Sequence, residues 1–526
     1  MSVPPVSTEA SSGEPNLHEQ ERQRRANREA VRSLGLDPYG ERTEGLVTLA
    51  EAKGAWDEAA DKEVAARGKE PGFQDPRPVR RVAGRAMLIR DTGKLVWMNL
   101  RDATGDLQIA VSQRDVDAAG FELAKLTDLG DVLVAEGRIM KTRTGEVTLW
   151  CSSIHPASKS LVPPPAKHEG LQDIELRYRR RYVDLWANPQ TLDVFLLRAR
   201  LISQMRRFLD DRGFVEVDTP VLQTLAGGAA ARPFVTHMNA LDIDLYLRVA
   251  PELFLKRLLV GGMPRVYEVA RNFRNEGVDR SHNPEFSMVE VYEAFGSYLT
   301  MMELTESLIR SLATTASSAD SGNEIVIAYG ECAIDYAQPF DRVTYADLFE
   351  RAFGFPLSDD AKVRAAAAER GLKTDGVDRL LLVQELFDEA ERAIDPTLPT
   401  FVMDYPAPLC PLTRSKKGHP DIAERFELFV AGMEIANAYT ELNDPDVQEA
   451  KFREQLAGIK DEERTFRTID EDFLHALKVG MPPAGGLGIG VDRLVMLLTG
   501  QTSIRDVLLF PLMRPQHRSE GGGAST

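Results

Sequence analysis

The chain has 526 residues, more than one hydrophobic core usually supports, so we expect two or more domains. Its apolar content of 43% and charged content of 28% exclude a fibrous or wholly disordered chain. The net charge of −17 excludes a protein that coats nucleic acid nonspecifically, because that needs a broad basic surface. No apolar run approaches the roughly 18 residues of a membrane span, and the N-terminus lacks the order of a secretion signal, so we expect a cytoplasmic protein.

The N-terminal 74 residues are expected to combine a disordered tail with a helical extension. Residues 1–15 are rich in Ser, Pro and Glu without periodicity, which is typical of disorder. Apolar residues spaced among arginines and glutamates predict an amphipathic helix over residues 17–34 that ends near Gly35. The arginines of this helix (Arg22, Arg24, Arg25, Arg28, Arg32) and a second cluster (Arg177, Arg179, Arg180, Arg181) could contact RNA, but such runs are more often solvated faces.

Residues 75–160 are predicted to form a small β-barrel. Five alternating β-rich runs separated by turn signals lie between Val79 and Ile154, with a helical insert over residues 121–126. This count is compatible with an OB-fold, a barrel that often binds single-stranded nucleic acid. Many small barrels bind other ligands, so the pattern alone leaves the ligand open.

A second and larger domain is expected over residues 186–515, after a linker over residues 161–185 that contains three consecutive prolines. Helical segments mix here with many β-rich ones and do not alternate regularly with them, which predicts an α+β domain on a mixed, mainly antiparallel sheet. No GxxxxGK[ST] motif occurs, so a nucleotide must be held in another way. A flexible tail is expected over residues 516–526. The three cysteines, Cys151, Cys332 and Cys410, are too far apart to suggest a metal site or disulfides, so we expect reduced thiols.

Two segments of this domain carry candidate chemistry. In RVYEVARNFRNEGVDRSHNPEFSMVEVYEAF, a strand period of two would place Arg274 with Glu276 on one face and Glu290 with Tyr292 on one face. GGLGIGVDRLVMLLTG places a glycine-rich strand directly before Arg493 and an apolar helix. Close approach to a ligand and tight helix–sheet packing explain these glycines equally well.

These motifs resemble those of class II lysyl-tRNA synthetases of the bacterial type, and the resemblance covers residues 17–515. RGFVEVDTP with Pro220 is similar to the dimer-forming motif 1 of the family, FRNEG…HNPEF to motif 2 and GLGIGVDR to motif 3. GGAAARPF, LRVAPELFLKR and NAYTELNDP resemble segments typical of the lysine enzymes. The resemblance implies ATP-dependent activation of lysine, its transfer to lysine tRNA, and a homodimer.

The resemblance also implies an ATP site. Arg274 would lie between the lysine carboxylate and the α-phosphate, and Arg493 at the γ-phosphate, where permanently charged guanidinium groups suit the chemistry. Glu427 and Glu434 would hold Mg²⁺, because this ion prefers carboxylate and phosphate oxygens. Glu427 would also belong to the residues that bind ATP. The remaining residues implied to bind ATP surround the adenine: Glu276, His282, Asn283 and Phe286.

The residues implied to bind lysine form a second group. Gly228 and Glu252 would take the α-amino group, and Asn437 would assist at the carboxylate. Specificity would come from carboxylates that meet the ε-ammonium, since burying that charge requires such partners. This side-chain pocket would comprise Glu290, Tyr292, Tyr439 and Glu441. In the barrel, Trp97, Gln108 and Glu146 fall where the family reads the anticodon, with Trp97 in place of the more usual phenylalanine.

Some residues depart from the family pattern. Met238 replaces a common histidine, Ser281 precedes His282 where some relatives have arginine, and Ala484-Gly485-Gly486 stands in place of Thr-Ala-Gly. These departures leave open a specialised or inhibitor-resistant paralogue that transfers lysine to another acceptor. A noncatalytic RNA-binding relative is the third hypothesis, and it would be expected to have lost Arg274, Arg493 or the paired glutamates.

Overall fold

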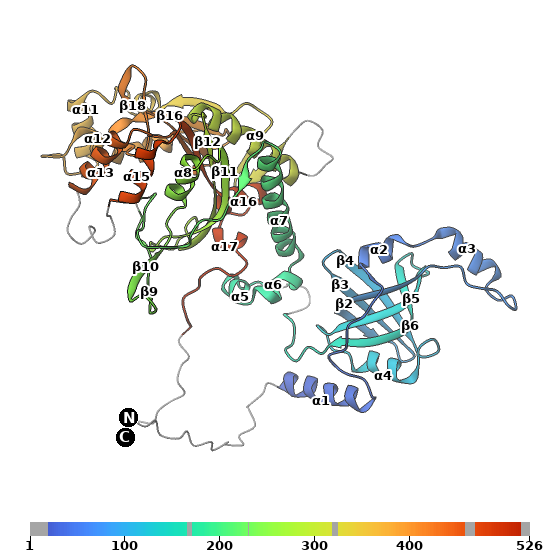
Figure 1. Cartoon of the computed structure of the whole chain (residues 1–526). Helices are drawn as coiled ribbons and strands as arrows, with labels where there is room; N and C mark the ends of the chain where they lie inside the picture. The colour runs from blue at the N-terminus through green and yellow to red at the C-terminus, as the bar shows by residue number, and fades with distance from the viewer. Residues whose placement is uncertain (1–18, 166–170, 230, 318–324, 458–468, 517–526) are drawn as a thin grey trace, which may run out of the picture. The chain divides into compact units, whose positions relative to one another are not determined.

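The structure is a computed structural model that describes residues 19–165, 171–229, 231–317, 325–457 and 469–516 (Figure 1). The chain forms two compact units that divide between Leu192 and Asp193. The tail predicted over residues 1–15, and all of the predicted C-terminal tail except residue 516, lie outside the described residues.

The first unit is a barrel with helices on its periphery. Strands β2, β3, β4, β6 and β5 follow one another around it, and pairing of β2 with β5 closes the ring. The prediction of a five-stranded OB-fold is therefore confirmed. The elements of this unit are α1 (Glu19–Ser33), β1 (Leu46–Val47), α2 (Leu49–Gly54), α3 (Glu58–Arg67), β2 (Val79–Asp91), β3 (Leu95–Asp102), β4 (Gly105–Ser112), α4 (Ala118–Leu126), β5 (Val132–Lys141), β6 (Val147–Ser158), α5 (Ile174–Arg179) and α6 (Arg181–Ala187).

Side-chain alternation decides which faces of the barrel strands are buried. In β3, Val96, Met98 and Leu100 point into the core, while Trp97 and Asn99 lie on the outside. Helix α4 starts three residues before the predicted insert, because the carboxylate of Asp117 caps it by accepting a hydrogen bond from the backbone of Gly120. The strands thus present a continuous outer face on which polar and aromatic side chains can meet a ligand.

The arginine-rich helix α1 confirms the helix predicted near the N-terminus, and its arginines make intramolecular contacts. Arg24 is buried and donates hydrogen bonds to the carbonyls of Leu129 and Ser160, which ties α1 to the barrel. Arg28 and Arg32 pair with Glu29. In the second cluster, Arg177 and Arg181 both pair with the buried Asp184. These contacts favour a structural role for much of both clusters.

The second unit is built on a nine-stranded sheet. Its elements are α7 (Pro189–Asp210), β7 (Val215–Glu216), β8 (Leu222–Gln223), β9 (Val235–Met238), β10 (Ile243–Leu247), α8 (Glu252–Val260), β11 (Arg265–Phe273), β12 (Glu285–Ala294), α9 (Tyr298–Ala316), β13 (Val326–Tyr329), β14 (Cys332–Asp335), β15 (Asp341–Thr344), α10 (Tyr345–Phe353), α11 (Asp360–Glu369), α12 (Arg379–Glu391), β16 (Thr400–Pro406), the 3-10 turn η1 (Ala407–Leu409), β17 (Ser415–Lys416), β18 (His419–Val430), β19 (Met433–Thr440), α13 (Pro445–Ala457), α15 (Glu471–Gly480), β20 (Ala484–Gly490), α16 (Val491–Thr499) and α17 (Ile504–Val507).

The sheet has the order β15-β16-β18-β19-β20-β12-β11-β7, with β17 paired to β18. Only the outer pairs β15–β16 and β11–β7 are parallel, and the central pairs are antiparallel. The prediction of an α+β domain on a mixed, mainly antiparallel sheet is therefore confirmed. In the antiparallel centre of the sheet, side chains of neighbouring strands that point to the same face lie opposite one another.

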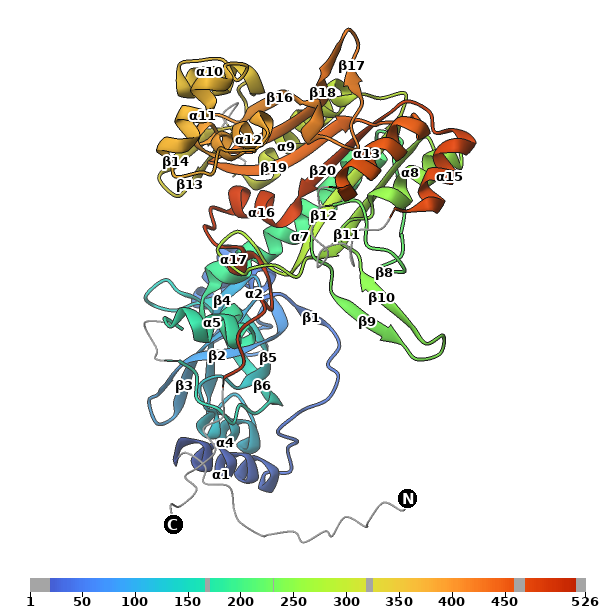
Figure 2. The same ribbon diagram turned by 90° about the vertical axis from the view of Figure 1, so that its left-hand side faces the viewer.

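The two faces of the central strands are covered differently (Figure 2). One face, which includes Val289 and Val291 of β12, packs into a large apolar core with α9 and α16. At one end of the opposite face, α8 and α15 lie against each other and against Tyr292. Helices α10, α11 and α12 form a separate apolar cluster with β16 and β18. The uncovered part of the second face is left for the cavity described below.

The three cysteines are free, as predicted, and Cys151 and Cys410 are buried. Among the residues that the structure describes, no helix combines the length and the apolar character that a membrane span requires.

Candidate active site

Strand register places the candidate site residues in two rows across the sheet. In one row, Gly488 of β20 pairs with Glu290 of β12 and with Asn437 of β19, and Asn437 pairs with Glu427 of β18. In the next row, two residues away on each strand, Gly486 pairs with both Tyr292 and Tyr439. Because residues two apart share a face, both rows line the side opposite the apolar core. Four strands thus deliver their polar residues to one surface.

This surface is hollowed into a cavity of about 660 Å³. Most residues implied to bind lysine or ATP line it: Gly228, Glu252, Arg274, Glu276, His282, Asn283, Phe286, Glu290, Tyr292, Glu434, Asn437, Tyr439 and Arg493. Glu427 and Glu441 lie behind the cavity wall, where Glu441 is fully buried and the side chain of Glu427 is 13% exposed.

Arg274 and Glu276 reach the cavity in a way that the sequence pattern did not predict. The alternation was expected to place them on one face of a strand, but β11 ends at Phe273 and both residues lie in the connection to β12. That part of the prediction is wrong, because the regular strand ends at Phe273: the backbone of Arg274 still donates a hydrogen bond to Pro284, but that of Asn275 donates to Arg232 instead. The loop nevertheless brings both side chains to the cavity.

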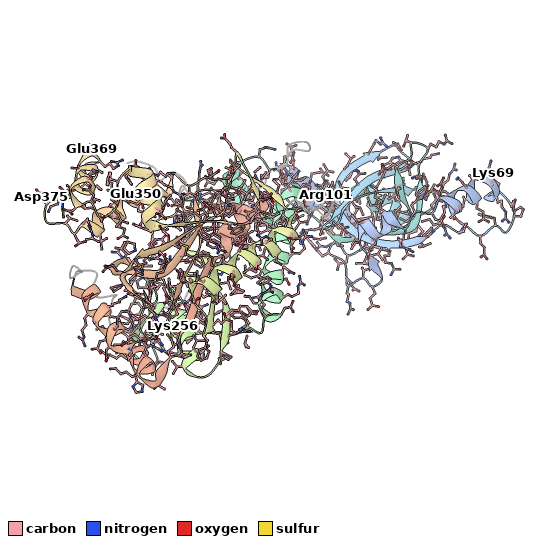
Figure 3. The ribbon with its side chains drawn as sticks, turned by 90° about the horizontal axis from the view of Figure 1, so that it is seen from above. Lys69, Arg101, Lys256, Glu350, Glu369 and Asp375 are labelled. Atoms are coloured by element: carbon pink, nitrogen blue, oxygen red, sulfur yellow. The ribbon has the colours of Figure 1, made fainter. Side chains whose placement is uncertain are left out.

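Three buried carboxylates form the acidic end of the site. Glu252 is 3%, Glu290 4% and Glu441 0% exposed. The ammonium of Lys256, itself fully buried, lies 2.6 Å from Glu252 Oε1 and 2.5 Å from Glu441 Oε2 (Lys256 is labelled in Figure 3). Glu290 Oε2 accepts a hydrogen bond of 3.1 Å from the hydroxyl of Tyr292.

Gly486 makes the room that Glu441 occupies. A Cβ at this glycine would lie 1.9 Å from Glu441 Oε1 and 2.7 Å from Tyr292 Cε1, far inside contact distance. At Gly485 a Cβ would instead meet the backbone of Ser297 at 2.9 Å. The glycine-rich strand therefore serves two purposes, side-chain space in the acidic end and close packing at the start of α9. Gly228, at φ +89°, similarly lies against Glu252 in a conformation that favours glycine.

Burial is the main cause of the pKa shifts among the carboxyl and hydroxyl groups at the acidic end of the site. It raises the pKa of Glu290 to about 8, and the charge of Glu252 adds to the shift. Burial also raises the pKa of Glu441, while Lys256 opposes that shift. The pKa values of Tyr292 and Tyr439 are well above their usual range for the same reason, so both hydroxyls remain neutral hydrogen-bonding groups.

Arginines mark the other end of the cavity. The guanidinium of Arg274 lies 5.0 Å from the centre of the Phe286 ring. Arg493, in the first turn of α16, donates a 2.8 Å hydrogen bond to the carbonyl of Glu434, and its Nη2 lies 2.8 Å from His282 Nε2. Among the described residues, Arg274 Nε has no hydrogen-bond partner although it is buried. An anionic ligand would supply the missing acceptor.

Glu427 and Glu434 offer the hard oxygen donors that a divalent cation prefers. Glu427 forms an ion pair with Arg425 and accepts a 2.9 Å hydrogen bond from Tyr405, while the side chain of Glu434 is 42% exposed. Within the described residues, no three His, Cys, Asp or Glu side chains are grouped to hold a metal by themselves. Two carboxylates fit a Mg²⁺ ion that takes its other ligands from phosphate and water.

In the first unit, the residues implied to read the anticodon lie on or beside the outer face of the barrel. Trp97 and Gln108 project from the neighbouring strands β3 and β4, and Gln108 accepts a hydrogen bond from Thr148. Glu146 lies in the turn before β6, 3.7 Å from the ammonium of Lys53. Trp150 of β6 packs edge-on against Trp97 with ring centres 6.1 Å apart.

Three further residues were missed by the sequence analysis: Lys256, Arg425 and Trp150. Lys256 follows Glu252 by four residues, a spacing that brings side chains together on a helix and could have indicated the pair. Arg425 precedes Glu427 by two residues on β18, the spacing of strand neighbours on one face. Its Nε lies 3.2 Å from Asn437 Oδ1, a contact between strands that no local pattern indicates.

Comparison with known proteins gives a consistent result. Residues 173–514 match the profile of class II tRNA synthetases (D, K and N), and residues 81–157 match that of the OB-fold nucleic acid binding domain. The chain is 45% identical to the lysine–tRNA ligase of Pelotomaculum thermopropionicum over 97% of each chain. It is 44% identical to that of Carboxydothermus hydrogenoformans, over 92% of this chain and 96% of the relative, and 44% identical to that of Enterococcus faecalis, over 95% and 98%. The chain belongs to the lysine–tRNA ligase family of class II aminoacyl-tRNA synthetases.

Proposed function

We propose that this chain activates L-lysine with ATP and transfers it to the 3′ end of lysine tRNA for translation in the cytoplasm. One observation carries the proposal: a single cavity is lined both by the buried carboxylates of Glu252 and Glu290 and by the guanidinium groups of Arg274 and Arg493. A substrate with a cationic side chain and an anionic reaction partner fits that distribution of charge.

In the first step, an oxygen of the lysine carboxylate attacks the α-phosphorus of ATP, the bond to the β-phosphate breaks, and pyrophosphate leaves. Arg274 holds both anions and stabilises the charge that builds on the α-phosphate, and Arg493 holds the γ-phosphate. Phe286 stacks on adenine beside Glu276, His282 and Asn283. In the second step, a ribose hydroxyl at the 3′ end of the tRNA attacks the carbonyl of lysyl-adenylate and AMP leaves.

The acidic end selects lysine. Glu441 Oε1 is buried without a hydrogen-bond partner among the described residues. The ε-ammonium of lysine would donate the hydrogen bond that this oxygen lacks. Glu290, Tyr292 and Tyr439 complete the side-chain pocket, while Glu252 and Gly228 take the α-ammonium and Asn437 assists at the carboxylate. A neutral or anionic side chain would leave these buried carboxylates unpaired, which disfavours asparagine and aspartate.

Glu427 and Glu434 would hold Mg²⁺, which neutralises phosphate charge when it is bound with ATP. The barrel would recognise the anticodon through stacking on Trp97, hydrogen bonds with the amide of Gln108 and hydrogen bonds that the carboxylate of Glu146 accepts. We also propose a homodimer. Exposed apolar side chains gather in the segment around motif 1, from β7 to β10: Val215, Val221, Leu222, Val235, Met238, Leu241 and Ile243. Exposed apolar patches of this kind often mark contacts between subunits.

The two alternatives are not favoured. The side chains that a noncatalytic relative would be expected to lose, Arg274, Arg493, Glu427 and Glu434, are all present at or directly behind the cavity. A paralogue that loads another acceptor would not need the anticodon barrel, and the chain retains a closed one.

Lysine-dependent exchange of pyrophosphate with ATP tests the proposal, with the other amino acids as controls. Arg274→Ala should lower exchange by about a hundredfold or more, because it removes a preorganised cation from the developing charge. Arg271→Ala is the matched control. That arginine is exposed on β11, three residues before Arg274, lies 3.4 Å from the carboxylate of Glu285 and does not line the cavity. Normal exchange by Arg274→Ala would contradict the assigned mechanism.

A further inference from the structure

Lys256 has no role in the function proposed above, yet it lies in contact with two of the residues that have one. Its ammonium bridges Glu252, four residues earlier on α8, and Glu441, which directly follows β19. All three side chains are at least 96% buried. The bridge therefore joins the carboxylate proposed to take the α-ammonium of lysine to one proposed to take the ε-ammonium.

The bridge is ionic. Burial alone would lower the pKa of the Lys256 ammonium, but the charges of Glu252 and Glu441 outweigh it and raise that pKa above its usual range. A buried cation between two carboxylates is stable only while its partners remain ionised. Glu268, another buried carboxylate nearby, has its own partner in Arg248 at 2.5 Å and needs no share of this ammonium.

We propose that Lys256 is a positioning residue that holds the carboxylates of Glu252 and Glu441 in place for the substrate and favours the ionised form of Glu441, so that the pocket can present two uncompensated negative charges once Glu290 gives up its proton. Three carboxylates, those of Glu252, Glu290 and Glu441, line or back this end of the cavity, and Lys256 compensates one of them. Lysine brings two ammonium groups, and the pocket becomes neutral when lysine binding releases the proton of Glu290. The inference rests on the proposed function.

Without Lys256, three carboxylates would remain buried with no internal cation between them. Such a cluster takes up protons, because like charges at low dielectric raise one another's pKa. Lysine would then have to displace additional protons on binding, and each unit of pKa to be overcome weakens binding about tenfold. The loss should be largest for a ligand that needs ionised carboxylates at both of its ends.

The test compares Lys256→Met with the wild-type chain in pyrophosphate exchange. We expect the KM for lysine to rise about tenfold or more, with the KM for ATP unchanged. For 6-hydroxynorleucine, which has a hydroxyl in place of the ε-ammonium, the inhibition constant should rise less than about threefold, because a hydroxyl also pairs with a protonated carboxyl. A merely structural role would change lysine and analogue equally.

Lys159→Met is the matched control. Lys159 is also a buried lysine between two carboxylates, 2.6 Å from Asp128 and 2.7 Å from Asp131, but it lies in the barrel unit. Lys159→Met removes a buried bridging ammonium just as Lys256→Met does, but it should leave the KM for lysine in exchange unchanged.

A measurement on the wild-type chain keeps the inference testable if Lys256→Met fails to fold. Calorimetry of lysine binding in buffers of different ionisation enthalpy counts the protons released. At a pH of about 7 Glu290 holds a proton, because burial raises its pKa to about 8, and the hydroxyls of Tyr292 and Tyr439 stay neutral. If Lys256 holds Glu441 in its ionised form, lysine binding should release about one proton, that of Glu290, whereas release of two or more would overturn the inference.

The outcomes also separate the two proposals. If the wild-type chain shows no lysine-dependent exchange, the proposed function fails. If exchange is normal but Lys256→Met binds lysine as well as the wild type, or loses lysine and analogue to the same extent, only the role of Lys256 fails.

Discussion

Glu290 holds a proton over much of the neutral range, because burial raises the pKa of its carboxyl to about 8. The groups around it are Glu252, Glu268 and the Tyr292 hydroxyl, with Arg274 as the opposing cation. An ammonium ligand needs the ionised form, so lysine binding must release this proton at any pH below about 8.

The KM for lysine should therefore fall as the pH is raised from about 6 towards about 8, by up to about tenfold per unit, and then level off. Exchange assays across this range at saturating ATP give the measurement. Glu290→Gln should have a higher KM and lose the part of the pH dependence that comes from Glu290, so its profile should be flatter over the same interval. A flat profile for the wild-type chain would show that Glu290 is already ionised.

Gly486 gives a second prediction at the scale of one residue. In Gly486→Ala, the new Cβ would overlap Glu441 Oε1 and Tyr292 Cε1. Lys256 anchors Glu441, and the pairing of β12 with β20 anchors Tyr292. Glu441 must move, so the KM for lysine should rise about tenfold or more while the KM for ATP stays constant. Gly490→Ala on the same strand is the control, since its nearest neighbour would lie at 3.8 Å. Equal lysine affinity in both variants would rule out the steric account.

At the scale of elements, strand alternation was the most informative signal. It predicted the barrel and placed Glu290 and Tyr292 on one face of what proves to be β12. The pattern failed at Arg274, because alternation cannot show where a strand leaves its partner. Local periodicity describes how a segment meets its immediate neighbours, and the end of a ladder depends on residues elsewhere in the chain.

Contacts between distant elements explain what the sequence analysis missed. The spacing of Glu252 and Lys256 could indicate a helical pair, but the second partner, Glu441, comes from the end of β19. Arg425 likewise meets Asn437 only because β18 and β19 are in register. The side chains assigned through family motifs could be named beforehand, whereas the groups that hold those side chains in place could not, since their partners lie far away in sequence.

At the scale of the whole molecule, the two units correspond to two parts of the proposed function, the activation of lysine and the binding of tRNA. The cavity lies wholly in the second unit, and the aromatic pair Trp97 and Trp150 lies in the first. In the proposed function, activation of lysine would need only the cavity, while charging of tRNA would also need the barrel to bind the anticodon. A substitution on the barrel face should therefore affect the two steps differently.

Trp97→Ala should leave lysine-dependent exchange unchanged and raise the KM for tRNA in charging about tenfold, because stacking of one base on an aromatic ring contributes roughly 1–3 kcal/mol. Trp97→Phe keeps an aromatic platform beside Trp150 and should retain most of the charging, which makes it the matched control. The side chain of Trp97 lies outside the barrel core, so both variants should fold. If Trp97→Ala charges tRNA as well as Trp97→Phe does, the anticodon does not stack on this ring; if exchange falls as well, the two units are not independent in the first step.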